Sequence, residues 1–184
     1  MLYIMRHGQT DWNVLHKLQG RTDIPLNDAG RAMAEQARER YREVPLDICF
    51  CSPLRRAKET AEIFLRDRKI PLVTDERLRE MSFGICEGML NPRYTDSESP
   101  VSVLFRHPEA YHCPPEGAES FEELFARTGE FLRETAGPLM DQGKNVLIVG
   151  HGAMNLSIIS RIQKLPIAEF WSPRINNCEL MRLI

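Results

Sequence analysis

The stretch Leu2-Tyr3-Ile4-Met5-Arg6-His7-Gly8 decides the fold that we expect for this chain. Its apolar run is short, and it stops at a charged residue followed by a glycine, which predicts a buried strand and a tight turn. A similar stretch, Asn145-Val-Leu-Ile-Val-Gly-His-Gly152, lies near the other end of the sequence. Because neither run alternates polar with apolar residues, both are typical of a parallel sheet that is covered on its two faces.

Between these two stretches, strand-like and helix-like segments alternate. We expect strands over residues 47–51 and 71–73, a helix over about 27–41, a helix capped by Ser52 with Pro53 in its first turn, a long helix opened by a Ser120–Glu123 capping box, and an edge strand within 178–184. Alternation of this kind favours an α/β protein. The predicted fold is a three-layer α/β/α sandwich with a mostly parallel central sheet.

Length and charge narrow the classes of protein further. The chain has 184 residues, which suits a single domain over residues 1–184. Its 24 basic and 26 acidic side chains nearly balance, which argues against a nucleic-acid partner. No apolar run approaches the ~20 residues of a membrane span, and no apolar segment of a signal peptide precedes Arg6. We therefore expect neither nucleic acid nor membrane as a partner.

The cysteines indicate a reducing compartment. There are five of them, an odd number, and no Cys-x-x-Cys pair occurs. This spacing predicts neither a disulfide framework nor a zinc ribbon. We expect a cytoplasmic protein.

Residues 89–117, which we call the insertion segment, differ in composition from the rest of the chain. Five of the twelve prolines fall in this segment, together with several aromatic residues and histidines. A connection of this length is uncommon in a compact domain unless it has a function. We predict a lid or specificity insertion; the alternative is a surface excursion without functional consequence.

Two histidines occupy equivalent positions, His7 after the first strand and His151 after the last parallel strand. Ligands of open α/β sheets bind at the carboxyl ends of the strands, so we expect these histidines to meet there. Arg6 precedes His7, and Arg55 lies in the first turn of the helix after the second strand. Arginine forks beside histidines predict an oxyanion site, with phosphate as the leading ligand.

These residues belong to an ordered set of motifs that resembles the histidine phosphatase superfamily, in its phosphoglycerate mutase-like branch. The matching segments are Arg6-His7-Gly8-Gln9-Thr10-Asp11-Trp12-Asn13, Gln19-Gly20-Arg21-Thr22-Asp23 with Pro25-Leu26, Ser52-Pro53-Leu54-Arg55-Arg56-Ala57 with Thr60, Leu78-Arg79-Glu80 with Phe83-Gly84 and Glu87-Gly88, and Gly150-His151-Gly152. One Arg-His-Gly triplet is weak evidence, but five segments in the right order cover most of the chain.

The resemblance implies a metal-independent phosphomonoesterase that needs no cofactor and acts on a small phosphorylated metabolite. His7 would be the nucleophile and form a phosphohistidine. Arg6, Arg55 and His151 would hold the phosphoryl oxygens and offset their charge. Zinc held by the two histidines is an alternative, but zinc needs further ligands and the arginines would repel it.

Three further residues receive roles from the resemblance. Asn13 would donate a hydrogen bond to the phosphate, and Gln19 would contact the substrate. Glu80 would protonate the leaving oxygen and then activate water. The segment Gly117-Ala118-Glu119-Ser120 departs from the family pattern, in which Gly-Glu-Ser often runs without the alanine, so the resemblance assigns no role to Glu119.

The same family contains mutases, and we expect hydrolysis for three reasons. The segment Glu80–Gly88 resembles the phosphatase-type pattern, the chain is short for a cofactor-dependent phosphoglycerate mutase, and the insertion segment has only Arg93 and Arg106 as cations. The mutase stays an alternative. So does a catalytically silent protein that binds phosphorylated ligands, although every matched chemical position holds a competent residue type.

Overall fold

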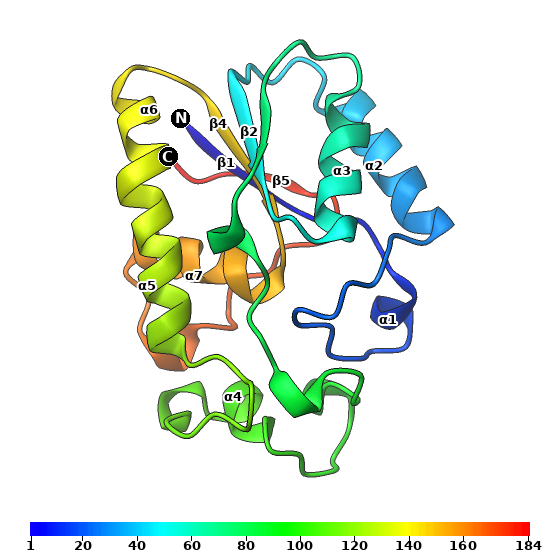
Figure 1. Ribbon diagram of the computed structural model, residues 1–184, viewed down its shortest axis with the longest axis vertical. Coiled ribbons are helices and arrows are strands. Elements are labelled where there is room, and N and C mark those ends of the chain that lie inside the picture. The colour runs from blue at the N-terminus through cyan, green and yellow to red at the C-terminus, as the bar shows by residue number, and fades with distance from the viewer.

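A computed structural model describes residues 1–184, and its centre is a five-stranded sheet (Figure 1). The strands are β1 (Leu2–Arg6), β2 (Ile48–Cys51), β3 (Leu72–Thr74), β4 (Val146–Gly150) and β5 (Leu180–Arg182). Their order in the sheet is β3-β2-β4-β1-β5. The first four are parallel, with Ile4 of β1 opposite Ile148 of β4, and β5 adds an antiparallel edge.

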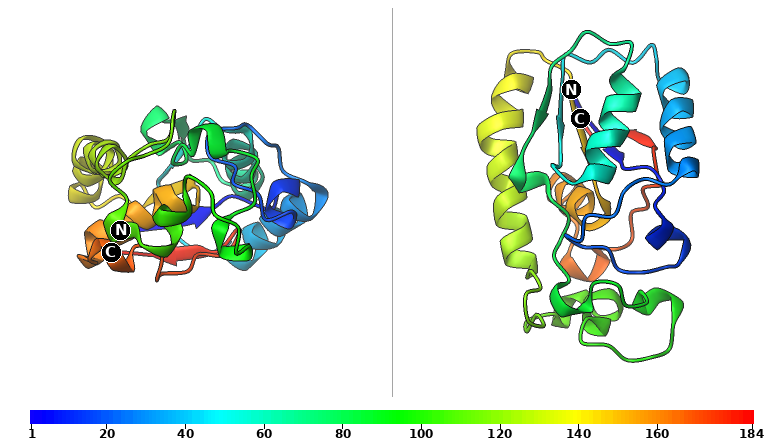
Figure 2. Two further views of the ribbon diagram at one scale, coloured as in Figure 1. Left: turned by 90° about the horizontal axis from the view of Figure 1, so that it is seen from below. Right: turned by 45° about the vertical axis from the view of Figure 1, so that its right-hand side comes forward.

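Helices cover both faces of the sheet (Figures 1 and 2). The helices are α1 (Asp11–Val14), α2 (Asp28–Arg40), α3 (Arg55–Leu65), α4 (Ser102–Arg106), α5 (Phe121–Phe131), α6 (Gly137–Asp141) and α7 (Gly152–Gln163). Leu2 and Ile4 of β1 pack toward α5 and α7, whereas Tyr3 and Met5 pack toward α2 and α3. Each central strand is therefore buried on both sides, which explains its unbroken apolar run.

The predicted three-layer α/β/α sandwich with a mostly parallel sheet is confirmed. The capping box is also present, since the Ser120 hydroxyl accepts the Glu123 N–H and the Glu123 carboxylate accepts the Ser120 N–H. None of the helices is both long and apolar enough to cross a membrane.

One helix start differs from the prediction. α3 begins at Arg55, with Leu54 in the capping position, and not directly after Ser52 and Pro53. The Arg55 N–H is capped by the Asp23 carboxylate at 2.8 Å. A cap from a residue this distant in sequence leaves no local signal, whereas a Ser-Pro pair does.

The insertion segment contains α4 and two short 3₁₀ turns, Pro92–Tyr94 and Pro108–Ala110. In Figure 1 it lies below the sheet, beyond the carboxyl ends of β1 and β4. The buried ring of Phe105 attaches it to the domain by stacking on Trp171, with ring centroids 4.8 Å apart. The segment therefore faces the end of the sheet where the two histidines were expected.

Candidate active site

A cavity of about 880 Å³ opens between the carboxyl ends of the parallel strands and the insertion segment. Arg6, His7 and Glu80 line it. His151 is fully buried and does not line the cavity, but its ring centroid lies 5.2 Å from that of His7. The structure thus brings together two histidines that are 144 positions apart in the sequence, as expected for residues at the ends of paired parallel strands.

The orientation of the His7 ring follows from its hydrogen bonds. Its Nδ1 lies 2.7 Å from the carbonyl oxygen of Gly8. Because a carbonyl only accepts, Nδ1 carries the proton and the lone pair of the ring is on Nε2. The His7 backbone is held at both ends, since its N–H donates to Gly150 and its carbonyl accepts from the Asn177 side chain. His7 therefore presents one unprotonated nitrogen in a defined direction.

Burial and nearby arginines keep both histidines neutral. Desolvation lowers the pKa of His7 well below 6.5, and the charges of Arg56 and Arg6 lower it further. Desolvation, followed by the Arg56 charge, lowers the pKa of His151 in the same way. Neither ring nitrogen of His151 has a hydrogen-bond partner in the protein. A buried, unpaired imidazole beside arginines suits a site that receives an anionic ligand.

Arg6 and Arg56 supply the positive charge of the site. Arg56 is fully buried and donates to the carbonyl oxygens of Thr22 and Gly20 at 2.9 and 2.7 Å. Burial lowers the pKa of Arg56 to about 10, so it remains a cation at pH 7. The Nε atoms of both arginines have no partner in the protein. Their N–H groups remain free for an oxyanion.

The loop that holds Arg56 is itself fixed by Glu87. The Glu87 carboxylate accepts the backbone N–H groups of Arg21 and Thr22 at 2.9 and 2.8 Å, and also the Thr22 hydroxyl. These bonds orient the carbonyl groups of Gly20 and Thr22. Glu87 therefore positions Arg56 without contacting it.

The structure corrects the expectation for Arg55, which is exposed and does not line the cavity. The arginine in the site is Arg56. The buried face of α3 runs through Arg56, Thr60 and Phe64, which are four residues apart, and Arg55 lies off this face. The four-residue spacing to Thr60 is the sequence signal that would have selected Arg56.

Asn13 and Gln19 both line the cavity. The Asn13 Oδ1 accepts from the Thr10 N–H in the capping box of α1, which leaves the Asn13 Nδ2 free to donate. Gln19 is buried, and its Oε1 has no partner. Both amides are thus available to a ligand.

The Glu80 carboxylate lies at the N-terminus of α7, the helix that begins directly after His151. Its Oε1 accepts the N–H groups of Met81 and Met154 at 2.9 and 3.0 Å, and its Oε2 accepts the N–H of Ala153 at 3.2 Å. Because the positive end of a helix dipole favours a carboxylate, this position orients the side chain firmly. Oε2 makes one of these bonds and Oε1 two, so Oε2 has more capacity left for a proton.

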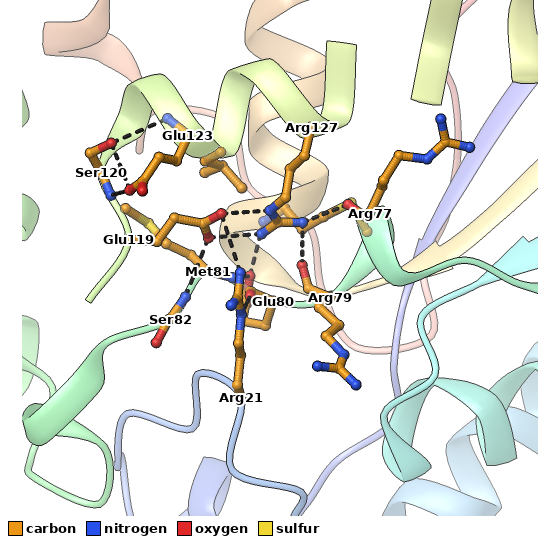
Figure 3. Close-up of polar contacts among 12 residues, drawn as sticks. Arg21, Arg77, Arg79, Glu80, Met81, Ser82, Glu119, Ser120, Glu123 and Arg127 are labelled. Carbon is orange, nitrogen blue, oxygen red and sulfur yellow. Dashed lines mark hydrogen bonds and ion pairs between the residues drawn. The ribbon is translucent and has the colours of Figure 1, made fainter. Parts of the chain in front are cut away.

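A buried ion pair holds the backbone on both sides of Glu80 (Figure 3). Arg127 makes a two-pronged contact with the Glu119 carboxylate, at 2.6 and 2.9 Å. The other end of the same guanidinium donates to the carbonyl oxygens of Arg77 and Arg79 at 2.5 and 2.7 Å. Arg127 therefore clamps the chain immediately before Glu80.

Glu119 extends this clamp to the other side. It accepts the Ser82 N–H at 3.4 Å and an ion pair from Arg21 at 3.3 Å. Arg21 also contacts the Glu80 carbonyl oxygen at 3.5 Å. Glu119 thus has a positioning role near Glu80, which its sequence context did not indicate.

The sequence reasoning missed several cations of the cavity. Arg93 and Arg106 come from the insertion segment, as noted, but Lys17 and Arg174 join them from other parts of the chain. Positive charge is therefore not scarce in the cavity as a whole, contrary to the expectation from the insertion segment alone. A cavity collects residues from distant segments of the chain, and that expectation counted the cations of one segment. No group of three or more His, Cys, Asp or Glu side chains lies close enough together to hold a metal ion.

The parallel sheet and the two histidines at adjacent strand ends place the chain in the class of α/β proteins whose ligand sites lie beyond the carboxyl edge of the sheet. The sequence model of the histidine phosphatase superfamily (branch 1) matches residues 2–184, and the chain belongs to this superfamily.

Its relatives include mutases and phosphatases. The chain is 29% identical to the 2,3-bisphosphoglycerate-dependent phosphoglycerate mutase 2 of Gloeobacter violaceus over 97% of its own length and 82% of the mutase. It is 35% identical to the uncharacterized phosphatase PhoE of Bacillus subtilis over 86% of its length and 75% of that protein. The structure of the alpha-ribazole phosphatase of Shigella flexneri matches with a TM-score of 0.81 and 28% identity over 97% and 87% of the two chains.

Proposed function

We propose that this protein is a metal-independent phosphomonoesterase that acts through a phosphohistidine on a small phosphorylated metabolite. The observation that carries the proposal is the buried His7 ring, whose Nε2 keeps its lone pair among cationic groups. The proton on Nδ1 is engaged by the Gly8 carbonyl, and the Nε–H groups of Arg6 and Arg56 have no partner in the protein. A nucleophile beside unused donors suits transfer of a phosphoryl group.

In the first step, His7 Nε2 attacks phosphorus and the phosphorus–oxygen bond of the ester breaks. The electron pair goes to the leaving oxygen, which takes a proton from Glu80 Oε2 and departs as an alcohol. Arg6, Arg56 and the His151 ring would offset the charge of the phosphoryl oxygens in this step.

In the second step, the Glu80 carboxylate takes a proton from water, and the resulting hydroxide attacks phosphorus. The phosphorus–nitrogen bond breaks, its electron pair returns to His7 Nε2, and inorganic phosphate leaves. The two steps together consume one ester and one water and yield one alcohol and one phosphate, with Glu80 protonated again.

We favour hydrolysis over mutase activity because exposed side chains in its lining leave the cavity open to solvent. The side chains at the mouth of the cavity, including Tyr94, Arg93 and Arg174, are exposed. A mutase must protect its phosphohistidine from water until the phosphoryl group has returned to the substrate. The cations at this mouth and the mutase relatives keep phosphoglycerate mutase as the second candidate.

The test is hydrolysis of p-nitrophenyl phosphate with and without a chelator, combined with rapid acid-free quenching to detect an acid-labile phosphoenzyme. We expect the chelator to leave the activity unchanged, and we expect a covalently bound phosphoryl group on the wild-type protein. His7→Ala should abolish both. Activity lost with the chelator would contradict the metal-independent mechanism, and a phosphoenzyme in His7→Ala would contradict the nucleophile.

A second assay separates the other candidates. With 3-phosphoglycerate and its bisphosphate cofactor, a phosphatase releases phosphate and forms little 2-phosphoglycerate. A mutase forms mainly 2-phosphoglycerate and releases little phosphate. A silent binding protein forms neither product but still binds the ester in calorimetry.

A further inference from the structure

The short segment before β5 lies against the end of β1 and makes three hydrogen bonds with it. The Arg6 side chain donates to the Ile175 carbonyl at 3.3 Å, and the Cys178 N–H donates to the Arg6 carbonyl at 2.8 Å. The Asn177 side chain donates to the His7 carbonyl at 2.6 Å. A segment from the end of the chain therefore contacts the proposed nucleophile directly through its backbone.

The backbone of this segment is strained where it makes these contacts. Cys178 has a φ of 57°, in the left-handed region that a residue with a Cβ atom rarely adopts. Such a conformation persists only where the surrounding contacts impose it. Here these contacts are the bond from the Cys178 N–H to Arg6 and the burial of the Cys178 side chain. The fold therefore holds the segment in one position against β1.

The peptide group between His7 and Gly8 is held on both of its sides. Asn177 donates to its carbonyl oxygen, and its N–H donates to the Thr60 hydroxyl at 2.9 Å. Because a peptide group is planar and its N–H and C=O point in opposite directions, two such bonds fix the rotation of the whole plane. The two partners come from different elements, α3 and the segment before β5.

The rotation of this plane sets the position of the next carbonyl. The Gly8 carbonyl oxygen follows directly after it and lies 2.7 Å from Nδ1 of the His7 ring. If the plane turned, the Gly8 carbonyl would move away from Nδ1, and the single proton of the neutral ring would be free to occupy Nε2. Nε2 would then lack the lone pair that attacks phosphorus.

We infer that Asn177 is a positioning residue of the phosphoryl transfer, which holds the His7 carbonyl so that the ring keeps its proton on Nδ1 and its lone pair on Nε2. The kinetic consequence rests on the proposed function, whereas the position of the proton follows from the geometry alone. Asn177 also lines the cavity, so direct contact with the substrate is the alternative that the test separates.

The neighbouring asparagine provides a matched control. Asn176 has the same side chain, one position earlier, and it also lines the cavity. Its side chain donates to the Glu179 carboxylate at 2.9 Å, and it has no bond to His7. Truncation of Asn176 therefore removes the same chemical group from the same segment and leaves the peptide after His7 held on both sides.

The first measurement is the release of p-nitrophenolate in the first turnover, which reports the attack of His7 before any phosphoenzyme is hydrolysed. Asn177→Ala should lower the maximal rate constant of this step by about tenfold to a hundredfold, as for a misplaced reacting group. The ester concentration that gives half of the maximal rate should change by less than about twofold, and Asn176→Ala should change neither value beyond that.

Three kinetic results would overturn the positioning role. An unchanged maximal rate in Asn177→Ala would show that the bond to the His7 carbonyl is dispensable. A higher half-maximal concentration at an unchanged rate would show a substrate contact instead. Equal losses in Asn177→Ala and Asn176→Ala would show a general effect of the segment.

The second measurement locates the ring proton without any substrate. Long-range ¹H–¹⁵N correlation spectra distinguish protonated from unprotonated ring nitrogens, and the His7 signals are those that His7→Ala lacks. We expect the proton on Nδ1 in the wild type and in Asn176→Ala, and a fraction of it on Nε2 in Asn177→Ala. A residue that only stabilises the fold would leave the proton in place, and that result overturns the inference, as does a wild-type ring protonated on Nε2.

The two measurements also separate this role from the proposed function. If the wild type hydrolyses no ester, the phosphatase proposal fails, and the spectra still test Asn177. If Asn177→Ala does not fold, Asn177→Asp replaces it in both measurements, because it keeps the shape of the side chain and a carboxylate cannot donate. If neither variant folds, Asn177 serves stability alone and the positioning role is overturned.

Discussion

The hydroxyl group of Thr60 accepts the backbone N–H of Gly8 at 2.9 Å, which ties helix α3 to the residue that follows His7. The same hydroxyl donates to the Arg56 carbonyl at 2.6 Å, one helical turn earlier. One side chain therefore connects the loop of the proposed nucleophile with the helix turn that carries the buried arginine. The relative position of His7 and Arg56 depends on this link.

The first prediction separates two adjacent arginines. Arg56→Gln should lower kcat/KM for p-nitrophenyl phosphate by about 10²–10³, the loss typical of removing one donor to a developing oxyanion. Arg55→Gln is the matched control and should stay within about twofold of the wild type, because Arg55 is exposed outside the cavity. Steady-state kinetics measures both. A larger loss in Arg55→Gln than in Arg56→Gln would contradict the placement of the two side chains.

The second prediction concerns Thr60. Thr60→Val keeps the shape of the side chain but leaves the buried Gly8 N–H without its acceptor, which costs about 1–3 kcal/mol of stability. We also expect kcat to fall, since the loop of His7 loses its tie to α3. Thr128→Val is the control, because Thr128 is an equally buried threonine of α5 whose hydroxyl bonds the Leu124 carbonyl. Urea unfolding should show losses in both variants, whereas assays should show lost activity in Thr60→Val only.

The third prediction tests the clamp around Glu80. Glu119→Gln removes one charge of a buried, two-pronged ion pair, and breaking such a pair costs about 3–5 kcal/mol. The free energy of unfolding should fall accordingly, and kcat should fall with KM little changed, because Glu80 would lose its fixed position. Glu123→Gln is the control, since this exposed carboxylate serves only the α5 capping box and glutamine caps as well. A Glu119→Gln protein with full kcat at a temperature where it is folded would refute the positioning role.

The fourth prediction concerns stability at acidic pH. His7 and His151 have folded-state pKa values well below 6.5, so the unfolded chain binds more protons than the folded protein below that pH. The free energy of unfolding must therefore fall as pH decreases from 6.5, by an amount that approaches about 1.4 kcal/mol per pH unit for each ring. The loss ends where the folded-state rings themselves become protonated.

Urea unfolding between pH 7.5 and 5 measures this dependence. His151→Asn should reduce the slope by the contribution of one ring. Equal slopes in the wild type and His151→Asn would show that the His151 pKa is not lowered by burial.

Much of the fold was predictable because its signals are local. The apolar runs of β1 and β4, with a histidine and a glycine after each, indicate buried parallel strands that end at a common edge. The capping box at Ser120 is equally local, since its two partners are three residues apart. The start of α3 was not predictable from Ser52 and Pro53, because its cap comes from Asp23, which lies 32 residues before Arg55.

The candidate site also contains residues that the sequence predicts and residues that it does not. The positions of His7, His151, Glu80, Asn13 and Gln19 at or beside the cavity follow from strand ends and from the ordered motifs. The sequence favours Arg55 where the structure has Arg56, because adjacent residues of a helix point about 100° apart, and which one faces inward depends on the packing of α3 against the sheet. The Arg174 charge was missed because it comes from a segment that no motif covers.

The sequence by itself determined the α/β class, the two histidines at equivalent strand ends and the membership of a family that handles phosphoryl groups, since these depend on local pattern and ordered motifs. Only the tertiary structure decided that Arg56 is the buried arginine, that His7 keeps its lone pair on Nε2, that Arg127 and Glu119 clamp the chain around Glu80, and that Arg93 and Arg174 share one cavity. Each of these depends on contacts between residues distant in the chain, and such contacts form only when the sheet and its helices pack together.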